Sequence, residues 1–160
     1  MANIYLGTPY FNTIQKDRVK AALIHLSHNQ TIDHLHFPFD FQYKGATIDN
    51  PKGGLFGSLE WQLATYHNDM TAIGKSDVGL FLYDTDNIDD GCAYEMGVFR
   101  AMQKPVVALL FTEAVEKPEI NLMIAQGVTT FMDGDKELPS LDSFDFDHPL
   151  ANPVCPYPVF

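Results

Sequence analysis

The chain has 160 residues, of which 46% are hydrophobic and 19% charged, a balance typical of a globular protein and not of a disordered one. This length allows one domain with a sizeable core and is too short for two ordinary ones, so we expect a single domain over residues 1–160. With 21 acidic against 10 basic residues, the formal net charge is −11, which repels a phosphate backbone and excludes DNA and RNA polymers as expected partners.

The first residues and the cysteines bear on where the protein works. Residues 1–7 lack the basic segment and long apolar stretch of an export signal, and the longest aliphatic run, 106–111, is too short to span a bilayer. The two cysteines, Cys92 and Cys155, show neither metal-ligand spacing nor a disulfide framework. These features predict a cytoplasmic protein with no membrane partner.

Strand and helix patterns alternate along the first half of the chain. Residues 3–6 form a short apolar run, and residues 15–27 place apolar side chains with the spacing of one helix face. A second strand is predicted over 34–39, followed by a long glycine-rich loop over 40–57. Ser58 can cap the helix that follows. The buried stripe of that helix is expected to consist of Leu59, Leu63, Tyr66, Met70 and Ile73.

The second half continues the alternation. Strands are predicted over 77–83, 106–111 and 128–131, and helices over 92–103 and 121–125. Because each strand is a continuous apolar run, the expected fold class is α/β, a doubly wound five-stranded parallel sheet with helices on both faces, as in flavodoxin-like and Rossmann-like sandwiches.

The C-terminal tail, about residues 133–160, is polar and rich in proline, and it ends in aromatic residues. It offers little core of its own, so we expect it to pack at a subunit interface.

Carboxylates gather where the predicted strands end. In open parallel sheets the ligand site lies beyond the C-terminal ends of the strands. There the sequence collects Asp84, Asp86, Asp89, Asp90 and Glu95. Glu95 is expected in the first turn of its helix, where the helix dipole stabilises an anion by about 0.3–1 kcal/mol, and an ionised carboxylate is what a nucleophile needs. The pattern leaves open that Glu95 only decorates a helix end and that the aspartates form a solvated loop.

Other kinds of site fit this sequence poorly. Residues 84–95 place acidic side chains at positions 1, 3 and 12 of an EF-hand-like loop, but Ile88 and Asp89 occupy positions that require a ligand and a glycine. No GxGxxG, Walker or GxSxG pattern occurs, and the histidines lack a third ligand motif. We therefore expect no metal and no cofactor.

Five short segments, spread over nearly the whole chain, are more specific together than any one of them alone. They are IYLG at 4–7, QYKG at 42–45, ATYHND at 64–69, DDGCAYEMG at 89–97 and INLMIAQGV at 120–128. In their order and spacing they resemble the nucleoside 2-deoxyribosyltransferase family of lactic-acid-type bacteria. The resemblance implies a doubly wound α/β fold, in agreement with the element order. It also implies an enzyme that moves 2-deoxyribose from a 2-deoxynucleoside to another purine or pyrimidine base.

The resemblance further implies roles for individual residues. Glu95 would be the nucleophile, and Asp69 and Asp89 would contact the base, with one of them handling the proton. Further substrate contacts would come from Tyr5 near the nucleophile, Phe11 lining the pocket, Gln42 facing the base, and Asn121 with Met123 reaching the sugar from a neighbouring subunit. The last pair implies a homo-oligomer, a hexamer in this family. The family usually ends in a tyrosine near the nucleophile, whereas this chain ends in Phe160, which has no hydroxyl to offer there.

The implied mechanism is a retaining double displacement through a covalent deoxyribosyl-glutamate, serving nucleotide salvage. Two alternatives share the architecture. One is an N-glycoside hydrolase of deoxynucleosides or deoxynucleotides, in which water replaces the second base. The other is a non-catalytic nucleotide-sensing or TIR-like interaction module, in which the carboxylates would be incidental. The sequence does not decide between a purine-only enzyme and one that also accepts pyrimidines, a choice that we expect the loop over 40–57 to make.

Overall fold

A computed structural model of the chain describes residues 1–150 and 152–160. The strands are β1 (Ala2–Gly7), β2 (Ile32–His36), β3 (Val78–Asp84), β4 (Val106–Phe111) and β5 (Thr130–Asp133). The α-helices are α1 (Thr13–Leu26), α2 (Leu59–Lys75), α3 (Asp90–Ala101), α4 (Leu122–Gly127) and α5 (Gly134–Glu137). Within the two described ranges, no helix combines the length and the apolar character needed to cross a bilayer.

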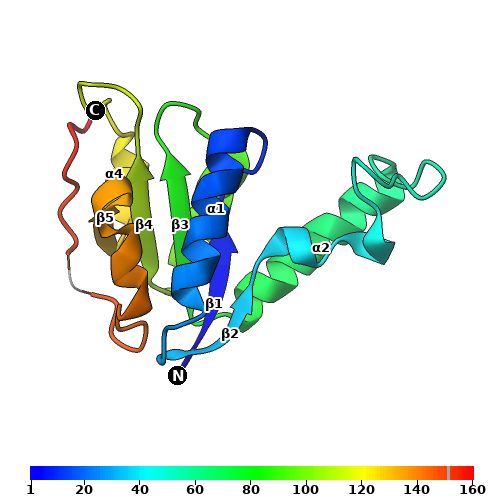
Figure 1. Cartoon of the computed structure of the whole chain (residues 1–160), viewed down its shortest axis with the longest axis horizontal. Coiled ribbons are helices and arrows are strands. Elements are labelled where there is room, and N and C mark those ends of the chain that lie inside the picture. The colour runs from blue at the N-terminus through cyan, green and yellow to red at the C-terminus, as the bar shows by residue number, and fades with distance from the viewer. Residues whose placement is uncertain (151) are drawn as a thin grey trace.

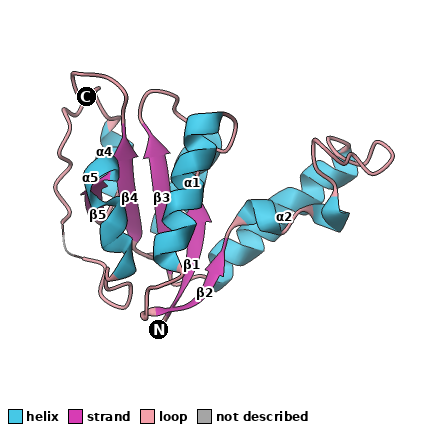
Figure 2. Cartoon of the chain, viewed as in Figure 1, coloured by secondary structure: helices cyan, strands magenta, loops and turns pink. Residues whose placement is uncertain are grey.

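The strands form one parallel sheet in the order β2-β1-β3-β4-β5 (Figure 2). The chain builds outward from β1 to β2, returns to β3 on the other side of β1, and then continues to β4 and β5. Strand order therefore reverses between β1 and β3, and in such sheets ligands bind beyond the C-terminal strand ends at this point. The predicted doubly wound α/β class is confirmed.

Successive side chains along the strands pack into two separate cores, one on each face of the sheet. The sheet therefore needs a layer of helices on each face. Ile4 and Leu6 of β1 pack with α1 on one face, whereas Tyr5 packs on the other face with α3. On the first face the residues Val19, Ala22 and Leu26 are buried, as the helical spacing predicted. Every residue of β3 and β4 is buried, because both of these strands are covered on two sides.

The C-terminal tail packs on its own chain along much of its length. Leu141 and Phe146 are fully buried in the core beneath α1, and Tyr157 belongs to the core on the opposite face. At the end of the chain, Phe160 N–H donates a hydrogen bond to the Ile120 carbonyl, and the Phe160 carbonyl accepts one from Leu122 N–H. The apolar residues of this tail therefore belong to the two cores of the domain. The contribution of this tail to a subunit interface stays a prediction.

Helix α2 leaves the edge of the sheet, so that its N-terminal half and the preceding loop stand away from the rest of the molecule (Figure 1). The side chains of Leu59, Leu63 and Tyr66 are accordingly 70%, 53% and 48% exposed. The predicted buried stripe is wrong for these three residues. Leu59 and Leu63 lie on the projecting half of the helix, and Tyr66 is paired through its hydroxyl with the exposed Tyr94 of α3 at 3.0 Å. It is right for Ile73, which packs beneath the sheet at the other end of the helix.

Candidate active site

A cavity of about 610 Å³ lies at the C-terminal end of β1 and is closed by the segment between β2 and α2. Its wall is largely apolar and aromatic, formed by Leu6, Tyr10, Phe11, Phe39, Ile48, Phe56 and Trp61. Its carboxylates are Asp49, Asp69, Asp89 and Glu95. This combination of an apolar wall and a few converging polar groups is typical of a small-molecule site.

Strand β1 holds the carboxylate of Glu95 in place. The Tyr5 side chain is fully buried, and its hydroxyl donates a 2.8 Å hydrogen bond to Glu95 Oε1. Two residues further along β1, Gly7 passes so close that an added Cβ would lie 3.1 Å from Glu95 Oε2 and would overlap the Phe81 ring. Gly7 therefore leaves room for the carboxylate that Tyr5 orients, and any larger residue there would displace one of them.

The position of Glu95 on its helix differs from the expectation. Helix α3 begins at Asp90 and is capped by Asp89, so Glu95 lies in the second turn, where the helix dipole acts weakly. Burial, only partly offset by the hydrogen bond from Tyr5, raises the pKa of Glu95 to about 7, with the charges of Asp69 and Asp89 adding to the rise. The expected position in the first turn is wrong, and burial has the largest effect on the pKa of this carboxyl. Both protonation states of Glu95 are populated near neutral pH.

The two aspartates have different surroundings. Both carboxylate oxygens of Asp89 accept backbone N–H groups, from Gly91 at 3.2 Å and from Cys92 at 3.4 Å, so this residue serves as the N-cap of α3. Asp69 lies on α2 and makes no hydrogen bond or ion pair with any residue that the structure describes. Burial raises its pKa to about 6. Of the two, Asp69 is the one free to exchange a proton with a ligand.

Four of the other predicted residues divide between the cavity and the surface. Phe11 and Gln42 line the cavity, and Gln42 Nε2 donates to the Pro38 carbonyl at 3.2 Å, which leaves its amide oxygen for a ligand. Asn121 and Met123 lie outside it. The Asn121 side chain caps α4 by accepting from Met123 N–H at 2.9 Å, and the Met123 side chain is 73% exposed.

Trp61 and Thr65 are among the cavity residues that sequence reasoning missed. They precede Asp69 by eight and four positions, which places all three on one face of α2. This spacing was a usable signal. If Asp69 faces the ligand, the residues four and eight positions before it on the same helix face the ligand as well.

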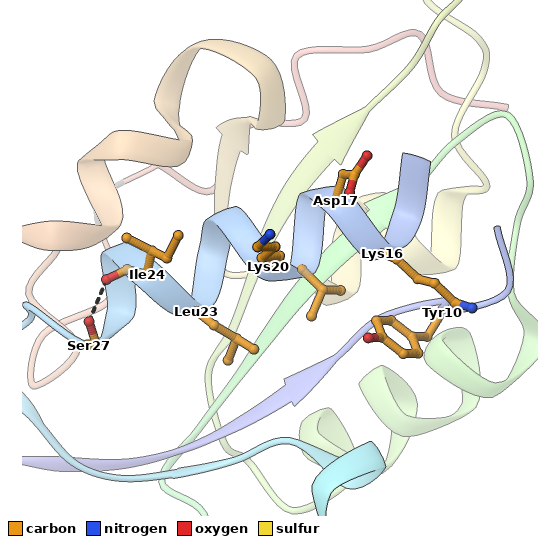
Figure 3. Close-up of a pocket in the computed structure, with 8 residues that line it drawn as sticks. Tyr10, Lys16, Asp17, Lys20, Leu23, Ile24 and Ser27 are labelled. Atoms are coloured by element: carbon orange, nitrogen blue, oxygen red, sulfur yellow. Dashed lines mark hydrogen bonds between the residues drawn. The ribbon is translucent and has the colours of Figure 1, made fainter. Parts of the chain in front are cut away.

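A second hollow runs along the outer face of α1 and has a volume of about 530 Å³ (Figure 3). It is lined by Tyr10, Lys16, Asp17, Val19, Lys20, Leu23, Ile24 and Ser27. The labelled side chains lie along the helix surface, and the Ser27 hydroxyl donates a 2.6 Å hydrogen bond to the Ile24 carbonyl. Because it gathers solvent-facing lysines and one carboxylate, this hollow offers less chemistry than the cavity around Glu95.

The acidic loop after β3 serves the fold. Asp84 accepts a 3.0 Å hydrogen bond from Gln15 and pairs with Arg18 at 3.5 Å. Asp86 accepts from the Thr112 hydroxyl at 2.7 Å and also from Glu113 N–H. In the part of the chain that the structure describes, no group of three or more His, Cys, Asp and Glu side chains is arranged to hold a metal ion. Because Asp84 and Asp86 already accept hydrogen bonds from other residues of the chain, they are disfavoured as the calcium ligands of an EF-hand-like loop.

The fold and this site together define an α/β protein whose ligand cavity supplies a tyrosine-held carboxylate and a second, protonatable one. A family model described as nucleoside 2-deoxyribosyltransferase matches residues 4–129. The nucleoside deoxyribosyltransferase of Limosilactobacillus fermentum is 49% identical over 158 residues, covering 98% of this chain and 94% of that protein. The corresponding protein of Lactobacillus leichmannii is 34% identical over 148 residues, covering 91% and 90% of the two chains.

A solved structure gives the same answer. The 2-deoxyribosyltransferase of the psychrotolerant bacterium Bacillus psychrosaccharolyticus superposes with a TM-score of 0.72 at 27% identity, covering 96% of this chain and 100% of that one. The chain belongs to the nucleoside 2-deoxyribosyltransferase family, and it is a transferase. The family predicted from the five segments is thereby confirmed.

The raised pKa of Glu95 predicts a pH-dependent gain of stability on replacing this residue. A carboxyl whose pKa rises from 4.5 to about 7 on folding favours the folded state fully below pH 4.5, and this contribution is lost as pH rises through 7. Glu95→Gln has no such loss, so it should be more stable than the parent at pH 8 by about 1–3 kcal/mol. Thermal unfolding at pH 8 and at pH 4.5 measures this, and a gain of equal size at both pH values would contradict the assignment.

Proposed function

We propose that the protein transfers 2-deoxyribose from a 2-deoxynucleoside to another purine or pyrimidine base through a covalent deoxyribosyl intermediate on Glu95, as a step of nucleotide salvage. The main support is the cavity geometry: Glu95 is oriented by a 2.8 Å hydrogen bond from Tyr5 and shares the cavity with Asp69. A nucleophile and a proton donor at one small-molecule site are the two groups that this reaction needs.

In the first half-reaction, an oxygen of the ionised Glu95 carboxylate attacks the anomeric carbon on the face opposite the base. The bond between the anomeric carbon and the base nitrogen breaks, its electron pair stays on the nitrogen, and the departing base takes a proton from Asp69. In the second, an incoming base attacks the same carbon, gives its proton to Asp69, and releases the carboxylate. Two inversions retain the configuration of the sugar.

Asp69 is the proposed proton carrier and Asp89 the proposed base contact that also caps α3. Asp69 is supported by its raised pKa, about 6, and by its freedom from protein hydrogen bonds in the described part of the chain. Asp89 is supported as a fixed acceptor, because two backbone N–H groups hold its carboxylate at the rim of the cavity.

We also propose that the protein is a homo-oligomer, a hexamer, in which Asn121 and Met123 contact the sugar in a neighbouring subunit's cavity. Both residues lie on the surface away from their own cavity, and backbone hydrogen bonds hold Phe160 beside them. The exposed side chains of Leu59, Leu63 and Tyr66 on the projecting half of α2 support burial by a second copy. The cytoplasmic location predicted from the sequence stays a prediction.

Introducing a charge at Met123 should weaken assembly and activity together. Met123→Glu buries a carboxylate in the proposed interface, so it should shift the sedimentation profile towards smaller species and reduce transfer about tenfold or more. Val115→Glu, at a fully exposed position of the loop after β4, should change neither and serves as the matched control. A fully active monomer, of the parent or of Met123→Glu, would remove Asn121 and Met123 from the site.

A single incubation with thymidine and adenine tests the proposed function. Chromatography should show deoxyadenosine and thymine formed in equal amounts, with the same yield in EDTA. Free deoxyribose without deoxyadenosine would identify the hydrolase alternative instead. Thymidine and 2-deoxyinosine that both remain unconsumed with adenine at high protein concentration would favour the interaction module, whereas unconsumed thymidine alone would identify a purine-only transferase.

A further inference from the structure

One face of α2 continues the cavity outward from the reacting carboxylates. Asp69, Thr65 and Trp61 all line the cavity and follow one another at intervals of four residues. Each interval advances about 6 Å along the helix axis, so Thr65 lies one turn beyond Asp69 and Trp61 one turn beyond Thr65. A bicyclic base whose glycosidic nitrogen is near Glu95 and Asp69 would extend along this face towards Thr65.

Two polar atoms on this face have no partner. Thr65 Oγ1 and Trp61 Nε1 are enclosed, and neither makes a hydrogen bond to any residue in the described ranges. The one other enclosed side-chain atom of this kind in those ranges, His36 Nε2, does not line the cavity. Folded proteins rarely leave buried polar groups unpaired, because each loses its hydrogen bonds to water without replacement. Both atoms belong to residues that line one cavity but are covered in this structure, so a ligand that pairs with them must displace what covers them.

The segment before α2, which contacts Trp61, is largely exposed. Phe56 packs on the Trp61 ring with centroids 4.7 Å apart, and Ile48, which also lines the cavity, is 78% exposed. Between them, Gly53 and Gly54 adopt positive φ, and a Cβ built on either would meet no atom within 4 Å. This segment can therefore move aside for a ligand with little loss of packing.

We propose that Thr65, with Trp61 beyond it, forms the outer end of the base subsite and recognises the exocyclic oxo or amino group on the edge of a purine remote from the sugar. The Thr65 hydroxyl can donate to an oxo group or accept from an amino group, whereas the Trp61 indole N–H can only donate. This assignment rests on the proposed function, and it makes Thr65 a specificity-determining residue.

Thr65→Val tests the proposal, because valine keeps the shape of threonine and removes the hydroxyl. With thymidine as donor, hypoxanthine and unsubstituted purine compete as acceptors in one reaction. The ratio of their kcat/KM values should fall about tenfold in favour of unsubstituted purine, the loss expected for one hydrogen bond. Trp61→Phe, which retains an aromatic ring against Phe56, should lower the same ratio. Thr71→Val, at an exposed position of the same helix, should leave it unchanged. An unchanged ratio in Thr65→Val, or an equal fall for both bases, overturns the proposal.

Binding measured without turnover separates this proposal from the proposed function. In the Glu95→Gln background, calorimetry should show that Thr65→Val weakens the binding of hypoxanthine about tenfold and that of unsubstituted purine less than twofold. If the parent transfers deoxyribose but this difference in binding is absent, the subsite assignment fails alone. If the difference is present but the parent transfers no deoxyribose, the proposed function fails and the subsite stands.

Discussion

Glu95→Gln should reduce deoxyribosyl transfer by at least about 10³-fold while the protein stays folded. Glutamine preserves the size of the side chain and can still accept the hydrogen bond from the Tyr5 hydroxyl, now 2.8 Å from Glu95 Oε1. Its amide oxygen is a poor nucleophile, so no covalent sugar can form. The loss of activity should therefore occur without disturbance of the cavity, and with the gain of stability at pH 8 described above.

Two measurements establish this result. Transfer from thymidine to adenine gives the rate, and the intact mass of protein quenched during turnover should show a deoxyribosyl adduct in the parent and none in Glu95→Gln. Asp17→Asn, an exposed substitution on α1 outside the cavity, should retain both the rate and the adduct. Transfer by Glu95→Gln within tenfold of the parent would reject Glu95 as the nucleophile.

Asp69→Asn should have the second largest effect, a loss of about 10²–10⁴-fold in the rate of transfer, which is the usual contribution of a positioned general acid. Asparagine cannot give a proton to the departing base or take one from the incoming base. The loss should be smaller for a donor whose base leaves readily without protonation, and equal for all donors if Asp69 only shapes the cavity. Comparing rates across donors with bases of different acidity makes this distinction.

The pH dependence of kcat/KM gives an independent test of the same pair. Activity should rise with pH as Glu95 ionises, near its pKa of about 7, and fall with pH as Asp69 loses its proton, near its pKa of about 6. Because the two carboxyls interact, each apparent pKa of the profile describes the pair and not one residue. The profile should be bell-shaped with its maximum between pH 6 and 7. Asp69→Asn should lose the descending limb and shift the ascending limb to lower pH, since the charge of Asp69 helps to raise the pKa of Glu95. A flat profile from pH 5 to pH 8 in the parent would contradict this pairing.

Much of the site was predictable because its residues follow strands that the sequence marks clearly. The apolar run of β4 was predicted with its observed bounds, Val106–Phe111, and β3 was shifted by one residue. Once the strands are known to be parallel, their C-terminal ends must meet at one edge, which brings the residues after β1 and β3 together. The family resemblance added Asp69 and gave roles to Phe11 and Gln42, and the structure brings all three into the cavity with Glu95 and Asp89.

The sequence by itself determined the succession of strands and helices, the parallel sheet and the family, because each depends on neighbouring residues or on short segments in a set order. The tertiary structure alone decided the exposure of Leu59, Leu63 and Tyr66, since an apolar helix face is buried only where another layer lies opposite it. It also decided the protonation of Glu95. Tyr5, Asp69 and Glu95 are distant in sequence, and only the fold that buries Glu95 beside the other two removes water from its carboxylate and raises its pKa to about 7.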